Sequence, residues 1–230
     1  MFSIGQYNGA SLSDHTLCLT FDDGPGHTEG DGPGPKTVRL AEYLYSEGIL
    51  ATFFMVGAHI KKYPEAPRKV AALGHIIGNH TFQHLKPLPK HLSDNDDVVE
   101  EIELTDRLIK EFNLDNKIYF RAPWGSWSVE VAEKLNKDLH DGLDHIGPYF
   151  WDIESSDWSF WNQMKTAEEC AAAYLSKVEA VRKGIVLMHD STADLVVARN
   201  NNRTYETIKI LILELKRRGY RFVSLREIAI

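Results

Sequence analysis

Two groups of residues in this sequence have the types and the spacing of a hydrolytic metal site. Asp22 and Asp23 end the apolar run of residues 17–21, and His80 and His84 lie four residues apart later in the chain. A catalytic zinc ion commonly has three protein ligands and keeps one position for water or substrate. One carboxylate and two imidazoles would supply those ligands, and the second carboxylate would remain free for acid–base chemistry.

Each of these features also has an ordinary explanation. Two histidines four apart can arise by chance in a chain with ten histidines, and Asp-Asp-Gly-Pro is a common loop sequence. His80 and His84 would face the same way if the backbone turns helical after Asn79. Their joint occurrence after predicted strands favours the metal site, with Asp22 or Asp23 as the third ligand.

Three more polar residues are candidates for the same site. Arg121 follows an apolar stretch and is either a surface side chain or a bidentate partner of a carboxylate. His189 ends the apolar run 185–188 and is either structural or a general acid. Asp157 could hold His189 and raise its pKa, because an anion stabilises the imidazolium form.

Apolar runs alternate with amphipathic stretches along the chain. Strands are predicted over residues 16–22, 51–56, 75–79, 118–120, 145–151, 185–188 and 221–223, and helices over residues 36–47, 64–73, 94–112, 128–135, 167–182 and 204–218. This alternation indicates one α/β domain over residues 1–230, with parallel strands in a barrel or an open sheet. The chemical motifs follow strands, where such folds carry their active sites.

Composition excludes several classes of partner. The net charge is 26 − 33 = −7 without a long basic run, which argues against nucleic acid, and no apolar run reaches the length of a membrane span. Cys18 and Cys170 are predicted to be buried thiols rather than a disulfide. Residues 1–15 do not have the pattern of a signal peptide. The expected location is the cytoplasm for a full-length chain, or the cell envelope or exterior for a trimmed one, and the oligomeric state stays open.

Five short motifs give the chain a resemblance to a known family. They occur in the order and approximate spacing of the polysaccharide deacetylase family, the NodB-homology domain of carbohydrate esterase family 4, and span residues 16 to about 225. The motifs are Thr20-Phe21-Asp22-Asp23-Gly24-Pro25, His80-Thr81-Phe82-Gln83-His84, Arg121-Ala122-Pro123-Trp124-Gly125, Asp157-Trp158 and Leu187-Met188-His189.

The resemblance implies a fold, a cofactor and a role for each matching residue. The fold is a distorted (β/α) barrel with fewer than eight strands, and the cofactor is one divalent ion, zinc, with cobalt or nickel as alternatives. The implied roles are general base for Asp22, metal ligands for Asp23, His80 and His84, orientation of the base for Arg121, an oxyanion-binding backbone N–H for Trp124, general acid for His189, its partner for Asp157, and substrate contacts for Trp158, Leu187 and Pro123.

The chain departs from the family pattern in three places. Ala122 stands where a second proline is common, the loop 24–35 is longer than in compact members, and the stretch 138–165 is rich in aromatic residues. Both segments are expected to border the substrate groove. The five tryptophans are Trp124, Trp127, Trp151, Trp158 and Trp161. Core packing accounts for one or two of them, and sugar stacking is expected of the others.

These observations predict a metal-dependent enzyme that removes N-acetyl groups from amino sugars of a chitin-, peptidoglycan- or exopolysaccharide-like poly- or oligosaccharide. Four alternatives stay open: an O-acetyl esterase on acetylxylan, an amidohydrolase of a small non-sugar substrate, a non-catalytic carbohydrate-binding relative, and a non-haem iron oxygenase with two histidines and one carboxylate. Binding alone requires neither Asp22 nor His189, and an oxygenase would depend on oxygen.

Overall fold

The computed structural model describes residues 1–26, 33–113 and 116–228. The strands are β1 (Thr16–Gly24), β2 (Thr52–Met55), β3 (Ile76–Asn79), β4 (Lys117–Tyr119), β5 (Asp144–Ile146), β6 (Gly184–His189) and β7 (Arg221–Val223). The α-helices are α1 (Pro33–Ser46), α2 (Gly57–Lys62), α3 (Glu65–Ala72), α4 (Leu88–Ser93), α5 (Val98–Ile109), α6 (Val129–Asp138), α7 (Asp157–Asn162), α8 (Ala167–Val181), α9 (Val196–Asn200) and α10 (Thr204–Arg217). Short 3₁₀ turns are η1 (Lys110–Phe112), η3 (Pro123–Gly125) and η4 (Leu225–Glu227).

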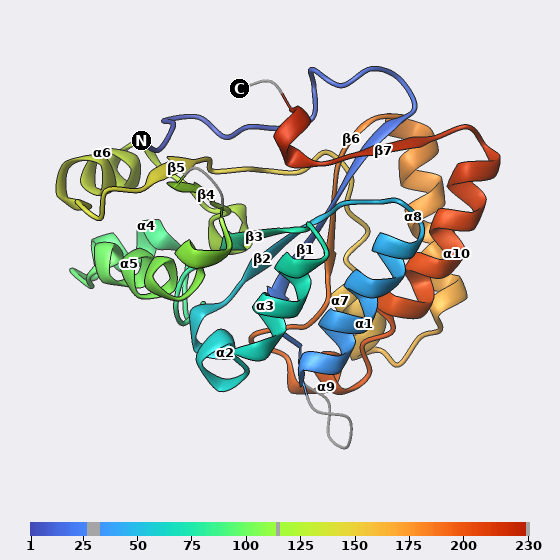
Figure 1. Ribbon diagram of the computed structural model, residues 1–230, viewed down its shortest axis with the longest axis horizontal. Coiled ribbons are helices and arrows are strands. Elements are labelled where there is room, and N and C mark those ends of the chain that lie inside the picture. The colour runs from blue at the N-terminus through green and yellow to red at the C-terminus, as the bar shows by residue number, and fades with distance from the viewer. Residues whose placement is uncertain (27–32, 114–115, 229–230) are drawn as a thin grey trace.

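The strands run parallel and curve around β1, which lies at the centre of the sheet (Figure 1). The order is β3-β2-β1-β6, β7 pairs with the start of β1, and β4 pairs with β5. Single bridges join Asn79 to Phe120 and Ile153 to Val186, so pairing extends from β3 toward β4 and from the segment after β5 to β6. The predicted distorted α/β barrel with fewer than eight strands is confirmed. The predicted strand 145–151 is wrong in length, because β5 ends at Ile146, just before Gly147 and Pro148.

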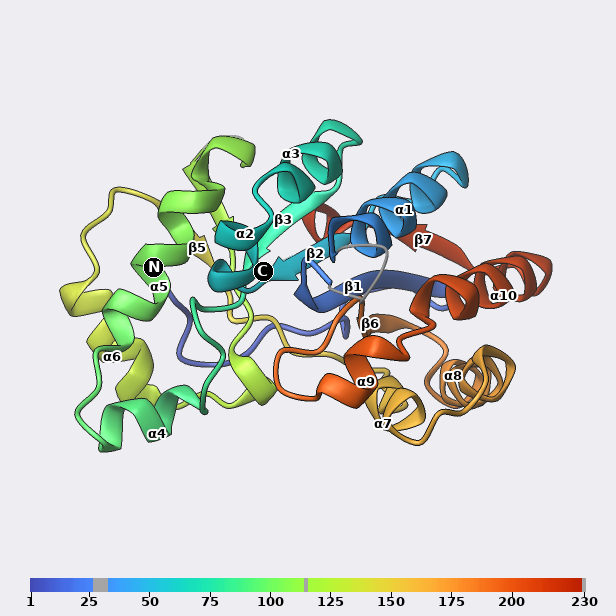
Figure 2. The same cartoon turned by 90° about the horizontal axis from the view of Figure 1, so that it is seen from below.

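Alternation along β1 separates the apolar core from the site. Leu19 and Phe21 belong to the main core cluster, which also contains residues of α1, α3, α8 and α10. These helices form an arc around the outside of the curved sheet (Figure 2). Thr20 and Asp22 occupy the alternate positions and therefore face the opposite, inner side. The mostly apolar strand thus carries polar side chains on its inner face near its carboxyl end.

The helices between β3 and β5 form a separate layer. Their core includes Leu88 of α4, Ile102 of α5 and Val131 of α6, and Phe2 from the N-terminal segment packs into it. The single helix predicted over 94–112 begins later, because the Asp97 side chain accepts hydrogen bonds from the first turn of α5. The short helices α2, α4, α7 and α9 were not predicted, since each is too short for a clear apolar period.

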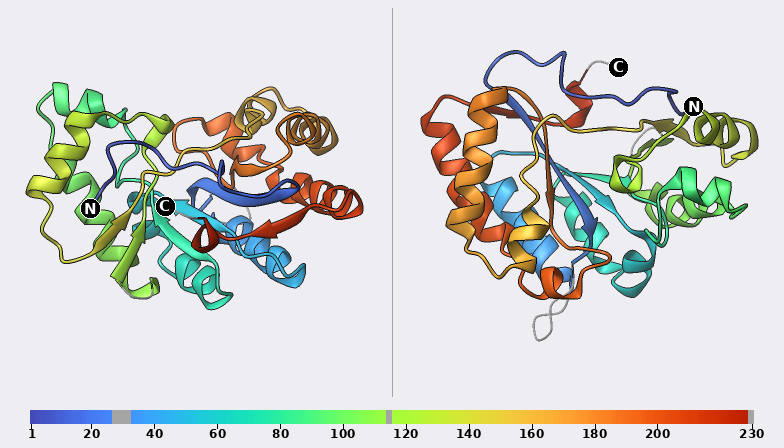
Figure 3. Two further views of the ribbon diagram at one scale, coloured as in Figure 1. Left: turned by 90° about the horizontal axis from the view of Figure 1, so that it is seen from above. Right: turned by 180° about the vertical axis from the view of Figure 1, so that it is seen from behind.

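The N-terminal segment crosses the end of the sheet opposite to the site (Figure 3). Gly9 N–H donates to Asp152 Oδ2 over 2.8 Å, and the same oxygen accepts from Ile185 N–H at the start of β6. Cys18 and Cys170 are both free and buried, as predicted. Among the described residues, no helix is long and apolar enough to cross a membrane.

Candidate metal centre and active site

A bulge at the end of β1 directs two consecutive carboxylates to the same place. Pairing with β2 shifts register between Asp22 and Gly24, and Asp23 has a φ of 71°. In a regular strand, neighbouring side chains point to opposite faces, and a bulge changes the direction of one of them. As a result, both carboxylates reach one imidazole: His80 Nε2 lies 3.6 Å from Asp22 Oδ2 and 3.4 Å from Asp23 Oδ1.

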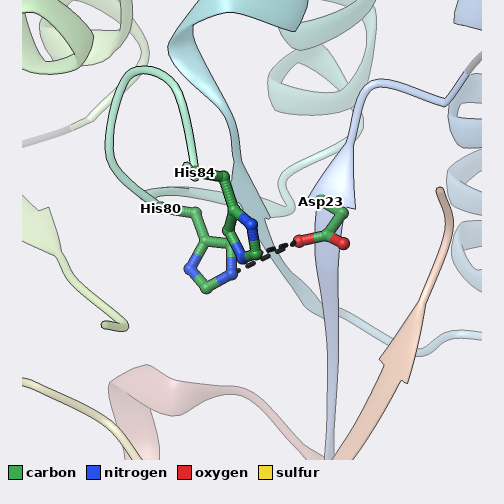
Figure 4. Close-up of side chains that lie close together, drawn as sticks. All are labelled: Asp23, His80 and His84. Carbon is green, nitrogen blue, oxygen red and sulfur yellow. Dashed lines mark ion pairs between the residues drawn. The ribbon is translucent and has the colours of Figure 1, made fainter. Parts of the chain in front are cut away.

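Asp23, His80 and His84 have the geometry of a three-residue metal site (Figure 4). Asp23 Oδ1 is 3.4 Å from His80 Nε2 and 3.4 Å from His84 Nε2. Ligands at zinc-bond lengths of about 2.0–2.2 Å lie about 3.3–3.6 Å apart in a tetrahedron, so both separations fit. Asp23 Oδ1 is buried and has no hydrogen-bond donor among the described residues. A buried oxygen without a donor that faces two imidazole nitrogens suits a cation.

The two histidines converge through left-handed backbone conformations and not through a helix. Thr81 has a φ of 65° and His84 a φ of 53°, and residues 80–87 are neither helix nor strand. The helical turn after Asn79, considered above as one way to align the two histidines, is therefore not formed. Asn79 stabilises the loop instead, because its Oδ1 accepts from Thr81 N–H and its Nδ2 donates to Asp106 Oδ1.

A second group of possible metal ligands, Asp106, Asp141 and His145, lies next to this loop and contacts it through Asn79. His145 Nε2 is 2.8 Å from Asp106 Oδ2 and 3.6 Å from Asp141 Oδ2. Asp106 is the residue that accepts from Asn79. Burial raises the pKa of Asp106, while the His145 hydrogen bond and charge oppose that rise. The contacts give this group a structural role, since they connect β5 through α5 to the loop that carries His80.

Arg121 is fully buried and holds Asp22 from the inner face of the sheet. Its Nη1 donates to Asp22 Oδ1 over 2.8 Å and to Thr20 Oγ1 over 2.8 Å. Its Nε and Nη2 donate to the carbonyl oxygens of Tyr149 and Phe150. The expected bidentate contact with the carboxylate is wrong, because the backbone after β5 uses the other nitrogens. These four hydrogen bonds fix the orientation of the guanidinium, and Asp22 Oδ2 accepts no hydrogen bond from it.

His189 lies beside Asp22 and carries a buried carboxylate partner. The two residues are in register on β6 and β1. Asp157, at the start of α7, accepts from His189 N–H and from His189 Nδ1, each over 2.7 Å. Burial opposes the charged imidazole, but the Asp157 charge and hydrogen bond raise the pKa of His189 to about 10. With Nδ1 engaged, the other ring nitrogen of His189 carries a proton that is available to a ligand.

The two histidines of the candidate metal site lower the pKa of Asp23. Burial alone would raise the pKa of the Asp23 carboxyl, yet His84 and His80 beside it hold that pKa well below its usual range. The carboxylate is therefore ionised at neutral pH, as a metal ligand must be.

The metal triad, Asp22 and His189 line one cavity of about 360 Å³, whereas Arg121 and Asp157 support Asp22 and His189 from outside its lining. Its walls include the predicted residues Asp22, Asp23, His80, His84, Trp124, Trp158, Leu187 and His189. Trp151 also lines it, whereas Trp161 is buried in the main core and Trp127 is partly buried against the core of α4, α5 and α6. Three of the five tryptophans are thus available for a sugar. Pro123 is buried at the start of η3, the turn that presents Trp124, and is not among the lining residues, so its substrate contact stays a prediction.

Three lining residues were missed, and all of them follow β6. Thr192, Asp194 and Leu195 border the cavity. Their only signal in the sequence is that they follow a strand that ends in a functional histidine. Asp190 is buried beneath them, accepts a hydrogen bond from Thr37, and has a pKa of about 7, raised mainly by burial. Residues 27–32 of the loop 24–35, which is expected to border the substrate groove, lie outside the described residues.

Comparisons with known proteins identify the family of the chain. The polysaccharide deacetylase family model matches residues 9–140, more than half of the chain. A chitooligosaccharide deacetylase of Rhizobium leguminosarum bv. trifolii is 29% identical over 96% of this chain and 95% of its own length. A peptidoglycan-N-acetylglucosamine deacetylase of Bacillus cereus is 29% identical over 91% of this chain and 68% of its own length.

Solved structures share the fold. A polysaccharide deacetylase from Bacillus cereus has a TM-score of 0.67 at 24% identity, covering 92% of each chain. A CE4 family pseudoenzyme from Bacillus anthracis has a TM-score of 0.66 at 19% identity, covering 93% of this chain and 65% of its own. With its ordered motifs gathered in one cavity and the family match over most of its length, the chain belongs to the polysaccharide deacetylase family.

Proposed function

We propose that this protein is a metal-dependent deacetylase that removes N-acetyl groups from amino sugars in an oligo- or polysaccharide. The proposal rests on three groups that meet at one cavity: a metal triad, a carboxylate bound by Arg121, and a histidine paired with a buried aspartate. The relatives named for chitooligosaccharides and peptidoglycan support an N-acetylated glycan as the substrate.

Asp23, His80 and His84 would hold one divalent ion, for which zinc fits the mixed nitrogen and oxygen ligands. A bound ion of this kind polarises a carbonyl oxygen and lowers the pKa of water. Asp22 is assigned as the general base, because Arg121 occupies only its Oδ1 and leaves Oδ2 on the side of the triad. It accepts the proton of the water that attacks the acetyl carbon.

His189 is assigned as the general acid on the opposite side of the scissile bond. Its free ring nitrogen donates a proton to the amide nitrogen as the carbon–nitrogen bond breaks, so that the sugar leaves as a neutral amine. Asp157 keeps that proton in place near neutral pH. The backbone N–H of Trp124 is assigned to the oxyanion, a contact whose loss typically costs about 3 kcal/mol. Leu187, Trp158 and Trp151 then border the acetyl group and the sugar ring.

The His189–Asp157 pair also favours an amide over an ester substrate. An amide nitrogen must be protonated before it leaves, whereas an alkoxide leaves with less assistance. The same pair argues against a binding-only role, because carbohydrate binding requires neither a charged imidazole nor a free base.

Release of acetate from a substrate panel tests the function. The panel contains N-acetylated chitooligosaccharides, peptidoglycan, acetylxylan and small N-acyl compounds, with Asp22→Asn protein as the inactive control. We expect acetate and new free amines from an N-acetylated glycan only. Release from acetylxylan alone would replace the proposal with an esterase, and no release from any glycan by zinc-loaded protein would refute it.

A further inference from the structure

The loop after β6 contacts two of the three metal-ligand residues. Ala193 N–H donates to Asp23 Oδ2 over 2.9 Å. That bond leaves Asp23 Oδ1, the oxygen that faces both ligand histidines, without a donor among the described residues. The loop therefore sets which oxygen of the carboxylate is offered to a metal.

His80 and His84 face Asp23 with Nε2, and their other ring nitrogens, Nδ1, have different surroundings. His80 Nδ1 is 2.8 Å from the carbonyl oxygen of Arg121, a backbone group. His84 Nδ1 is buried and forms no hydrogen bond among the described residues, and the nearest carboxylate oxygen is Asp194 Oδ2 at 3.5 Å. The Asp194 side chain is 47% exposed and lines the mouth of the cavity. One ligand is thus oriented by the fold, and the other faces a side chain on a loop.

We propose that Asp194 is the positioning residue for His84, and that the loop 190–195 orients two metal ligands together through Ala193 and Asp194. A histidine that binds a metal through Nε2 carries its proton on Nδ1, and that proton requires an acceptor when it is buried. Asp194 is the only carboxylate that the described residues bring to this nitrogen. Trp124 packs on the His84 ring at a centroid distance of 4.2 Å, so the ring is held between an aromatic and an anion.

This inference rests on the metal assignment made above, and it is independent of the substrate. Loss of such an outer partner typically weakens metal binding about 10–100-fold. The expected order of zinc affinity is wild type, then Asp194→Asn, then Asp194→Ala, because the asparagine oxygen can still accept the Nδ1 proton. Acetate release by Asp194→Ala protein should recover at saturating zinc.

Zinc affinity is measured by competition with a chromogenic chelator at pH 7.5, with thermal melting to check folding. The matched control is Asp138→Ala, which removes a partly exposed carboxylate that is paired with Lys134 on α6 and does not line the cavity. Wild-type affinity in Asp194→Ala would overturn the proposal, and so would equal losses in Asp194→Asn and Asp194→Ala, which would reveal a general charge effect. Tight zinc binding by wild type without deacetylation would refute the proposed function and leave this inference intact.

Discussion

Replacing Asp157 by asparagine should lower the pH above which the rate of deacetylation declines. Asp157 is fully buried, and its two oxygens accept from His189 N–H and Nδ1 over 2.7 Å. Burial disfavours the protonated imidazole, so the pKa of about 10 for His189 depends on neighbouring anions, with Asp157 foremost. An asparagine keeps the shape and one acceptor oxygen but removes the charge.

The size of the effect follows from the two pKa values. A general acid with a pKa of about 10 is about 99% protonated at pH 8. At the reference pKa of about 6.5, only about 3% is protonated at pH 8, which is a loss of about 30-fold, whereas about three-quarters is protonated at pH 6. A bound divalent cation lowers the pKa in both proteins, so the displacement between them is the quantity to compare.

The assay is the rate of acetate release from an N-acetylated chitooligosaccharide between pH 5 and pH 10, for wild type and Asp157→Asn. We expect the rate of the variant to decline at a lower pH than that of wild type, and the two rates to become similar near pH 6. An activated aryl acetate serves as the control substrate, because its leaving group needs no proton. An unchanged alkaline limit, or equal losses on both substrates, would refute the assignment of His189 as a general acid held by Asp157.

Four further substitutions test other parts of the site and of the core. His80→Ala should abolish zinc binding and glycan deacetylation together, as measured by metal analysis, and a metal-free but fully active variant would refute the mechanism. Asp22→Asn should keep the metal and lose about 100-fold or more in rate; loss of metal here, with retention in Asp23→Asn, would reverse the two roles. Trp161→Ala should lower the free energy of unfolding by about 3–5 kcal/mol in urea, since Trp161 is fully buried. Trp158→Ala, at a cavity-lining residue that is 39% exposed, should instead raise KM for the glycan with little change in stability.

Residue types and strand-end positions made most of the site predictable from the sequence. Asp22, Asp23 and His189 directly end apolar strands, and parallel strands bring their carboxyl ends to one edge of a sheet. Five short motifs in a fixed order also indicated the family. The long amphipathic helices α1, α8 and α10 were also predicted, because each shows an apolar stripe over several turns.

The direction of each side chain was decided only by the tertiary structure. The sequence has no local signal for the bulge that turns Asp23 toward Asp22, or for the left-handed residues that replace the expected helix before His84. It also could not reveal that carbonyl oxygens after β5 would occupy Arg121, or that Asp194 would face His84. A motif specifies which chemical groups are present, whereas their hydrogen-bond partners come from segments distant in sequence. Those partners exist only once the chain has folded around β1.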